Sequence, residues 1–195
     1  MALQPIKKIS VDTEQIINSA VTVPKLGYRD YFRIRLTSGI GDFNDLSSTV
    51  VDFHNSGTVD FDTSNGWSGD SNNRWQAAED GIWQFGFSLG TSRNDTNKIR
   101  DLVVGVEEST NGSTWTEIFQ SAKRGYDGAN DDSNGYLSNS YIHQVSAGNY
   151  YRLRASANTF TGTWRIANQA RDMVGYTPDN SSESVLTFFW GIRIY

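Results

Sequence analysis

Few residues in this chain have the type and spacing that catalysis or metal binding requires. The 195 residues include two histidines and no cysteine, so a thiolate metal site, a disulfide or a cysteine nucleophile is not available. His54 lies beside a turn and His143 in a strand-like segment, and neither belongs to a metal-ligand spacing. The serines lack the Gly-x-Ser-x-Gly nucleophile elbow. We therefore expect no metal, no cofactor and no enzyme activity.

Carboxylates suggest two further chemistries, sugar hydrolysis and calcium binding. A glycosidase needs two facing carboxylates, and the sequence alone does not pair any of Glu79, Glu107, Glu108 and Glu117. The aspartates of 127–132 stand in a polar loop whose oxygens could hold Ca²⁺. Aspartate is also a common turn former, so the loop does not by itself predict a calcium site.

Aromatic residues in loop-like segments are candidates for stacking on a glycan: Trp67, Tyr126, Tyr136 and Tyr176. The alternative, that these rings pack onto the rim of their own domain, stays open. The net charge is −5 and no run of Lys or Arg exceeds two residues, which argues against nucleic-acid binding. No apolar run has the length of a membrane span, so we expect no membrane contact.

The elements that would position such residues are short strands. After the turn Asp80-Gly81, apolar residues alternate with small or polar ones as far as Leu89. This alternation predicts a strand with Trp83, Phe85 and Phe87 facing a core. Similar patterns recur through the chain, at 31–37, 49–53, 59–61, 99–107, 114–122, 141–145, 150–157, 161–166 and 186–195. No long helix is indicated and 126–140 reads as a polar loop, so the pattern predicts two packed antiparallel sheets.

Four segments, in order along the chain, resemble the C1q/TNF-like pattern. They are the strand 31–37, the turn and strand 74–89, the strand–turn–strand 145–153 and the closing strand 188–195. The resemblance covers 28–195 and departs at Asn149, where that family usually has Asp, and in the insertion 91–140. It implies an all-β, antiparallel two-sheet jelly-roll sandwich, and it implies a homotrimer because members of the family usually form trimers.

The closing strand supports assembly independently of the resemblance. Phe188, Trp190, Ile192 and Ile194 form one apolar face, and the opposite face carries Phe189, Gly191 and Tyr195. A sandwich strand needs only one buried face, so a second apolar face requires another cover. We expect a trimer interface containing Phe189, Trp190 and Tyr195; cover by the N-terminal arm is the alternative.

Residues 1–27 form a separate region, an extended N-terminal arm ahead of the jelly-roll domain at 28–195. The arm has no aromatic residue, and Pro5 and Pro24 interrupt it. Eight aliphatic residues are too many for a solvated tail. We expect them to contact a partner or a neighbouring subunit: Ile6, Ile9, Val11, Ile16, Ile17, Val21, Val23 and Leu26.

These features together suggest a virion protein of a tailed bacteriophage. The chain has neither a collagen-like stalk nor an apolar leader, which sets it apart from secreted animal members of the family. We expect a trimeric capsid decoration (cement) protein, made in the host cytoplasm and attached to the major capsid protein by its arm and trimer base. The alternative is the receptor-binding tip of a phage tail fibre that recognises a host glycan.

Overall fold

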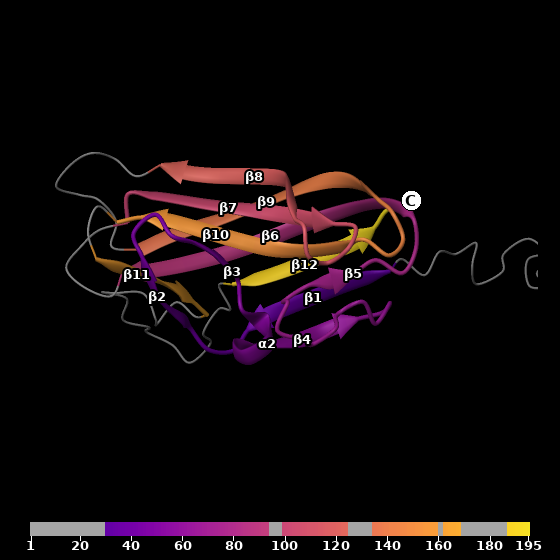
Figure 1. The fold of residues 1–195 in the computed structure, drawn as a ribbon, viewed down its shortest axis with the longest axis horizontal. Coiled ribbons are helices and arrows are strands. Elements are labelled where there is room, and N and C mark those ends of the chain that lie inside the picture. The colour runs from indigo at the N-terminus through magenta and orange to yellow at the C-terminus, as the bar shows by residue number, and fades with distance from the viewer. Residues whose placement is uncertain (1–29, 94–98, 125–133, 160–161, 169–186) are drawn as a thin grey trace, which may run out of the picture.

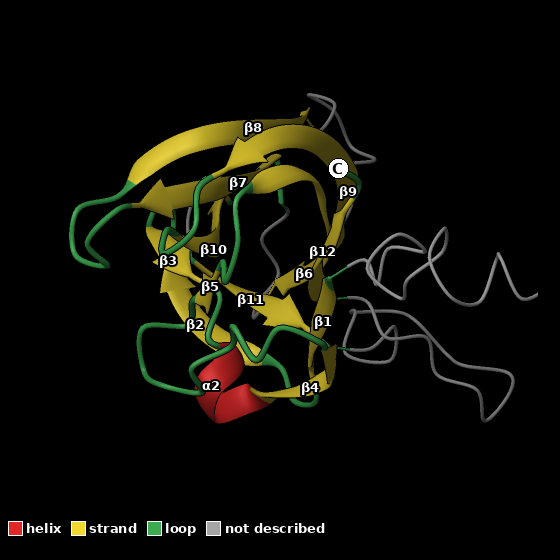
Figure 2. Ribbon diagram, turned by 90° about the vertical axis from the view of Figure 1, so that its right-hand side faces the viewer, coloured by secondary structure: helices red, strands yellow, loops and turns green. Residues whose placement is uncertain are grey.

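The computed structural model describes residues 30–93, 99–124, 134–159, 162–168 and 187–195, and most of them lie in two antiparallel sheets. Figures 1 and 2 show the two sheets packed face to face. The strands are β1 (Tyr31–Leu36), β2 (Ile40–Asn44), β3 (Ser48–Val50), β4 (Gly57–Asp62), β5 (Trp75–Gln76), β6 (Gly81–Arg93), β7 (Asp101–Ser109), β8 (Thr116–Arg124), β9 (Asn134–Val145), β10 (Tyr150–Asn158), β11 (Thr163–Ala167) and β12 (Phe188–Arg193). The prediction of an all-β two-sheet sandwich is confirmed.

The larger sheet has seven strands in the order β2-β11-β6-β12-β1-β4, and β9 pairs with the other edge of β6. The smaller sheet has the order β3-β10-β7-β8, with β5 also paired to β10. The closing strand β12 lies between β1 and β6, as the yellow arrow in Figure 1 shows, so the end of the chain occupies the middle of the larger sheet.

The core lies between the sheets and is built largely of aromatic rings. The alternation at 82–89 predicts its members correctly, because Trp83, Phe85, Phe87 and Leu89 are all fully buried. Phe85 stacks on Tyr151 of the facing sheet, with ring centroids 4.9 Å apart. The largest fully buried side chains are aromatic: Trp75, Trp83, Trp164, Tyr151, Phe32, Phe85, Phe87 and Phe189.

Trp75 is anchored on the short strand β5. Its ring stacks on Phe32 of the opposite sheet at 4.5 Å, and its indole nitrogen donates to Asp62 at 3.4 Å. The only helix among the described residues is the single turn α2 (Phe53–Ser56), which Asp52 caps by accepting a hydrogen bond from the Asn55 amide at 3.2 Å. The residues that the structure describes contain no helix long and apolar enough to cross a membrane.

The structure corrects one prediction of local structure. Residues 134–140, expected in a polar loop, belong to β9, which pairs with β6 from Gly81↔Val145 to Ser92↔Asn134. The serines and asparagines of this segment lie on a strand at the sheet edge, where backbone hydrogen bonds rather than apolar side chains hold the strand. Hydrophobic alternation therefore could not reveal it.

Candidate assembly surface

The outer face of the seven-stranded sheet carries exposed and partly exposed apolar side chains interspersed with polar ones, although its inner face already fills the core. On β12, Phe189 is 1% exposed while its neighbours Phe188 and Trp190 are half-buried and point outward. Pairing sets this orientation: Trp190 lies opposite Arg33 of β1, whereas Gly191 lies opposite the buried Phe32. We call the outward surface of β4, β1, β12, β6 and β9 the apolar face.

Gly86 and Trp190 shape the centre of the apolar face. The two residues are directly opposite in the β6–β12 pair. A methyl group on Gly86 would lie 2.3 Å from both Cε2 and Cζ2 of the Trp190 indole. Gly86 is not among the glycines with a positive φ, so the close approach of the indole, rather than backbone conformation, requires a glycine here. The ring therefore lies across strand β6 instead of standing away from the sheet.

The apolar face continues onto β9. Ile142 lies opposite Gln84 of β6 and is 64% exposed. Ile82 and Tyr136, on β6 and β9, are also exposed, and the Ser88 hydroxyl donates to the Tyr136 hydroxyl at 2.9 Å. Several large exposed apolar residues on one face of a sheet are typical of a contact surface rather than of a solvated one.

A groove of about 350 Å³ opens on the apolar face between β4, β1 and β12. Tyr31 and Phe61 meet edge to face on its β4 side, with ring centroids 5.1 Å apart. Arg33 lies over the Phe188 ring at 4.7 Å, and its guanidinium is 3.3 Å from Asp60. The groove is lined by Tyr31, Phe32, Arg33, Phe61, Phe188, Trp190, Gly191 and Ile192.

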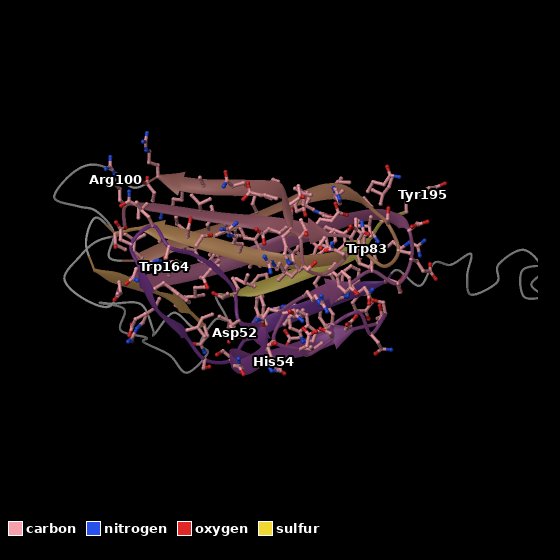
Figure 3. All side chains as sticks on the ribbon, viewed as in Figure 1. Asp52, His54, Trp83, Arg100, Trp164 and Tyr195 are labelled. Carbon is pink, nitrogen blue, oxygen red and sulfur yellow. The ribbon has the colours of Figure 1, made fainter. Side chains whose placement is uncertain are left out.

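The three residues predicted for the trimer interface occupy different environments. Trp190 lies on the apolar face. Tyr195 is 87% exposed at the end of the sandwich opposite the one that holds Trp164 (Figure 3). The prediction for Phe189 is corrected by the structure. Its ring packs against Phe85 in the subunit's own core, with centroids 6.0 Å apart, and the side chain is too buried to contact another subunit.

The arm residues lie outside the described part of the chain. These residues are Ile6, Ile9, Val11, Ile16, Ile17, Val21, Val23 and Leu26. Their contacts with a partner therefore stay a prediction.

Sequence reasoning missed Tyr31, Phe61, Gly86 and Ile142 as surface-forming residues. The alternation of 141–145 would have identified Ile142. The role of Gly86 required knowing that Trp190 lies opposite it.

The outer face of the five-stranded sheet is charged, in contrast to the apolar face. Glu107 is buried between Arg152 and Arg154, at 2.7 and 2.9 Å. The Arg152 guanidinium also lies over the Trp115 ring at 3.8 Å. Of the carboxylates considered for sugar hydrolysis, Glu107 and Glu117 are opposite each other on β7 and β8. The two arginines compensate Glu107 there, so it acts as the anchor of an ion-pair network.

Glu108 points the opposite way, into a polar cluster between the sheets. It accepts hydrogen bonds from the Tyr151 hydroxyl at 2.6 Å and the Asn149 amide at 2.9 Å, and His143 Nε2 is 3.5 Å away. Burial by itself raises the pKa of Glu108, but the hydrogen bonds from Tyr151 and Asn149 and the nearby His143 outweigh it and hold the pKa below its ordinary value. Burial and the Glu108 carboxylate raise the pKa of Tyr151. This cluster joins β9 of one sheet to β7 and β10 of the other.

Other residues proposed for chemistry are engaged in packing or lie outside the described ranges. Trp67 packs edge to face on Phe53 at 6.1 Å, and Tyr136 is exposed on the apolar face. Tyr126, Tyr176 and the acidic loop 127–132 are outside the described residues. Within those that are described, no three His, Asp or Glu side chains gather as a metal site would require.

Comparison with known proteins identifies the fold. No family model and no curated protein matches the sequence. Among solved structures, murine APRIL matches with a TM-score of 0.53 at 8% identity, over 85% of this chain and 99% of that one. Eiger TNF from S. frugiperda matches with a TM-score of 0.52 at 8% identity, over 86% and 92%. The fold is a C1q/TNF-like jelly roll, as the motifs along the sequence predicted.

Proposed function

We propose that this protein is a non-enzymatic structural protein that assembles into a homotrimer through its apolar face. The observation that carries the proposal is that the outer side of the seven-stranded sheet bears exposed apolar side chains, among them Ile82, Tyr136 and Ile142, which the protein's own core leaves uncovered. A closed ring of identical subunits would bury the outer side of each. The C1q/TNF-like fold supports three subunits, since the resemblance implies trimers.

The solution mass of the full chain tests the trimer. Light scattering should give three times the 21.8 kDa of one chain, or about 65 kDa. Ile142→Asp places a charge on the apolar face at a position exposed in the single subunit, so it should break the trimer without unfolding the chain. Thr116→Asp, on the exposed edge strand β8 of the other sheet, is the matched control and should leave the mass unchanged. A wild-type mass of 21.8 kDa contradicts the proposal.

We further propose that the trimer is a capsid decoration protein of a tailed bacteriophage, located on the virion and bound to the major capsid protein. The aliphatic arm and the lack of cysteine in the sequence support this role. A protein that binds only the assembled shell stabilises it by mass action. Heads made from the cognate major capsid protein should bind the full-length wild-type chain. The variant Ile16→Asp/Ile17→Asp should not bind to them. Undiminished binding of that variant would exclude an arm-mediated attachment.

The second candidate function is the tip of a tail fibre that binds a host glycan. The exposed ring of Tyr136 favours it, because a flat aromatic surface can stack on a sugar. Trp67 is a poor probe, since it packs against the core. Glycan-array binding that is lost in Tyr136→Ala or Tyr126→Ala would support this function, and an absence of any glycan or cell binding would exclude it.

A further inference from the structure

We propose that the groove between β4, β1 and β12 is the docking site of the chain's own N-terminal segment, with residues 21–26 lying against it. The groove has apolar walls that the described part of the subunit leaves open to solvent. Tyr31 is 40% exposed and Phe61 is 42% exposed. A concave apolar surface of this kind binds side chains that fill it without bringing unpaired polar groups.

The chain enters the body of the protein at this groove. The Asp30 carbonyl accepts a hydrogen bond from the Arg193 amide at 2.8 Å, and the Tyr31 amide donates to Thr63 Oγ1 at 2.9 Å. These bonds fix the last residue before β1 between β12 and the end of β4. Since Tyr31 is itself a wall of the groove, the preceding residues start from its rim.

Length and composition favour residues 21–26 as the occupant. Leu26 is five residues from Tyr31, so it reaches at most about 17 Å from the rim when extended. Val21 and Val23 alternate with Thr22, which places both valines on the same side of an extended chain. Pro24 and Gly27 are the residues expected where such a segment turns back toward its own strand.

The position of β4 favours an extended segment beside the groove. β4 ends the order of the seven-stranded sheet, and among the described strands its partner is β1. An unpaired strand edge with exposed apolar residues such as Val59 and Phe61 is a site where an extended segment can add. The chain's own segment is present at a high effective concentration, which no separate partner matches.

The inference assigns the groove end of the apolar face to the arm, leaves the part around Ile142 to a neighbouring subunit, and divides the arm into two parts. Residues 21–26 serve the groove, and the residues from Ile6 to Ile17 remain available to a partner. Docking of 21–26 would also set the point on the body from which those outer residues leave. The arm then approaches a partner from a defined position rather than from anywhere within its full reach.

Disulfide trapping in the full-length chain tests the docking, because the protein contains no cysteine of its own. Val23→Cys/Phe61→Cys should form an intrachain disulfide about ten times faster than the control Val23→Cys/Thr116→Cys, whose second cysteine lies on the other sheet. Val23→Cys/Ile192→Cys repeats the test if loss of Phe61 disturbs the fold. Non-reducing gels and peptide mass mapping separate bonds within a chain from bonds between chains. Equal rates for the groove and control pairs, or bonds formed only between chains, would overturn the inference.

Protection of a single thiol gives a second readout in the full chain. Phe61→Cys should react with a thiol reagent about five times faster when Val21→Asp/Val23→Asp removes the apolar contacts, while Thr116→Cys should react at the same rate in both backgrounds. No change at position 61 would also overturn the inference. Light scattering on the same samples reports the trimer independently, so loss of assembly and loss of docking are distinguished.

Discussion

Gly86→Ala tests whether the Trp190 indole really determines the shape of the apolar face. In a strand with ordinary φ, replacing glycine by alanine restricts the unfolded chain and stabilises the protein by about 0.4–1 kcal/mol. Here the new methyl group would lie 2.3 Å from two indole carbons, and the ring must move. Overpacking of this kind costs about 1–3 kcal/mol. We therefore expect a net destabilisation of about 1–2 kcal/mol.

A double-mutant cycle isolates the contact. In a Trp190→Leu background the clash is gone, so the same Gly86→Ala change should be neutral or stabilising, and the sign should reverse. Urea unfolding of all four proteins at one fixed concentration measures this, because the proposed assembly would make stability depend on concentration. Ser140→Ala, at the position facing Gly86 on β9, is the control and should change little in either background. Equal destabilisation by Gly86→Ala with and without the indole would refute the reasoning.

Three further predictions concern the polar interior and the charged sheet. Glu107→Ala should cost about 1–2 kcal/mol in urea unfolding, because Arg152 and Arg154 lose their buried partner but remain partly exposed to water. The folded-state pKa of Glu108 is lowered, so its stabilisation is present above the unfolded pKa of about 4.3 and is lost as pH falls through the folded value. Glu108→Gln should therefore flatten the loss of thermal stability below about pH 5. Asp62→Asn should lower the Tm by several degrees, since the Asp62 carboxylate accepts from the Trp67 amide at 2.7 Å.

Glu108 is not the only carboxylate whose ionised form stabilises the fold. Hydrogen bonds from Asn55 and Asn72 outweigh burial at Asp52 and Asp70 and hold the pKa of each below its ordinary value, so these two also lose stabilisation in acid. Glu108→Gln should consequently reduce the slope of stability against pH without abolishing it. An unchanged slope in this variant would contradict the cluster described around Tyr151.

The sequence revealed the fold because its central signals are local. Inward-facing positions of β6 follow directly from alternation after Asp80-Gly81, and the four C1q/TNF-like segments indicated the jelly-roll fold. It could not decide which side of β12 faces the core. Both sides of that strand are apolar, so the alternation is the same either way. Only the pairing of Gly191 with the buried Phe32 and Phe85 sets the direction, and those partners lie far away in the sequence.

The outer surfaces of the two sheets differ in chemistry, since one is charged and the other bears exposed apolar residues. This difference limits how the protein can assemble. Buried Glu107 and its arginines fix a hydrated, charged exterior on the five-stranded sheet, which loses little by remaining in water. Covering the apolar surface around Trp190 and Ile142 is favourable, because it removes that surface from water. Self-assembly should therefore proceed through the seven-stranded sheet, leaving the charged sheet facing outward from the trimer. A lysine introduced at Thr116 should then be tolerated, whereas one at Ile142 should abolish assembly.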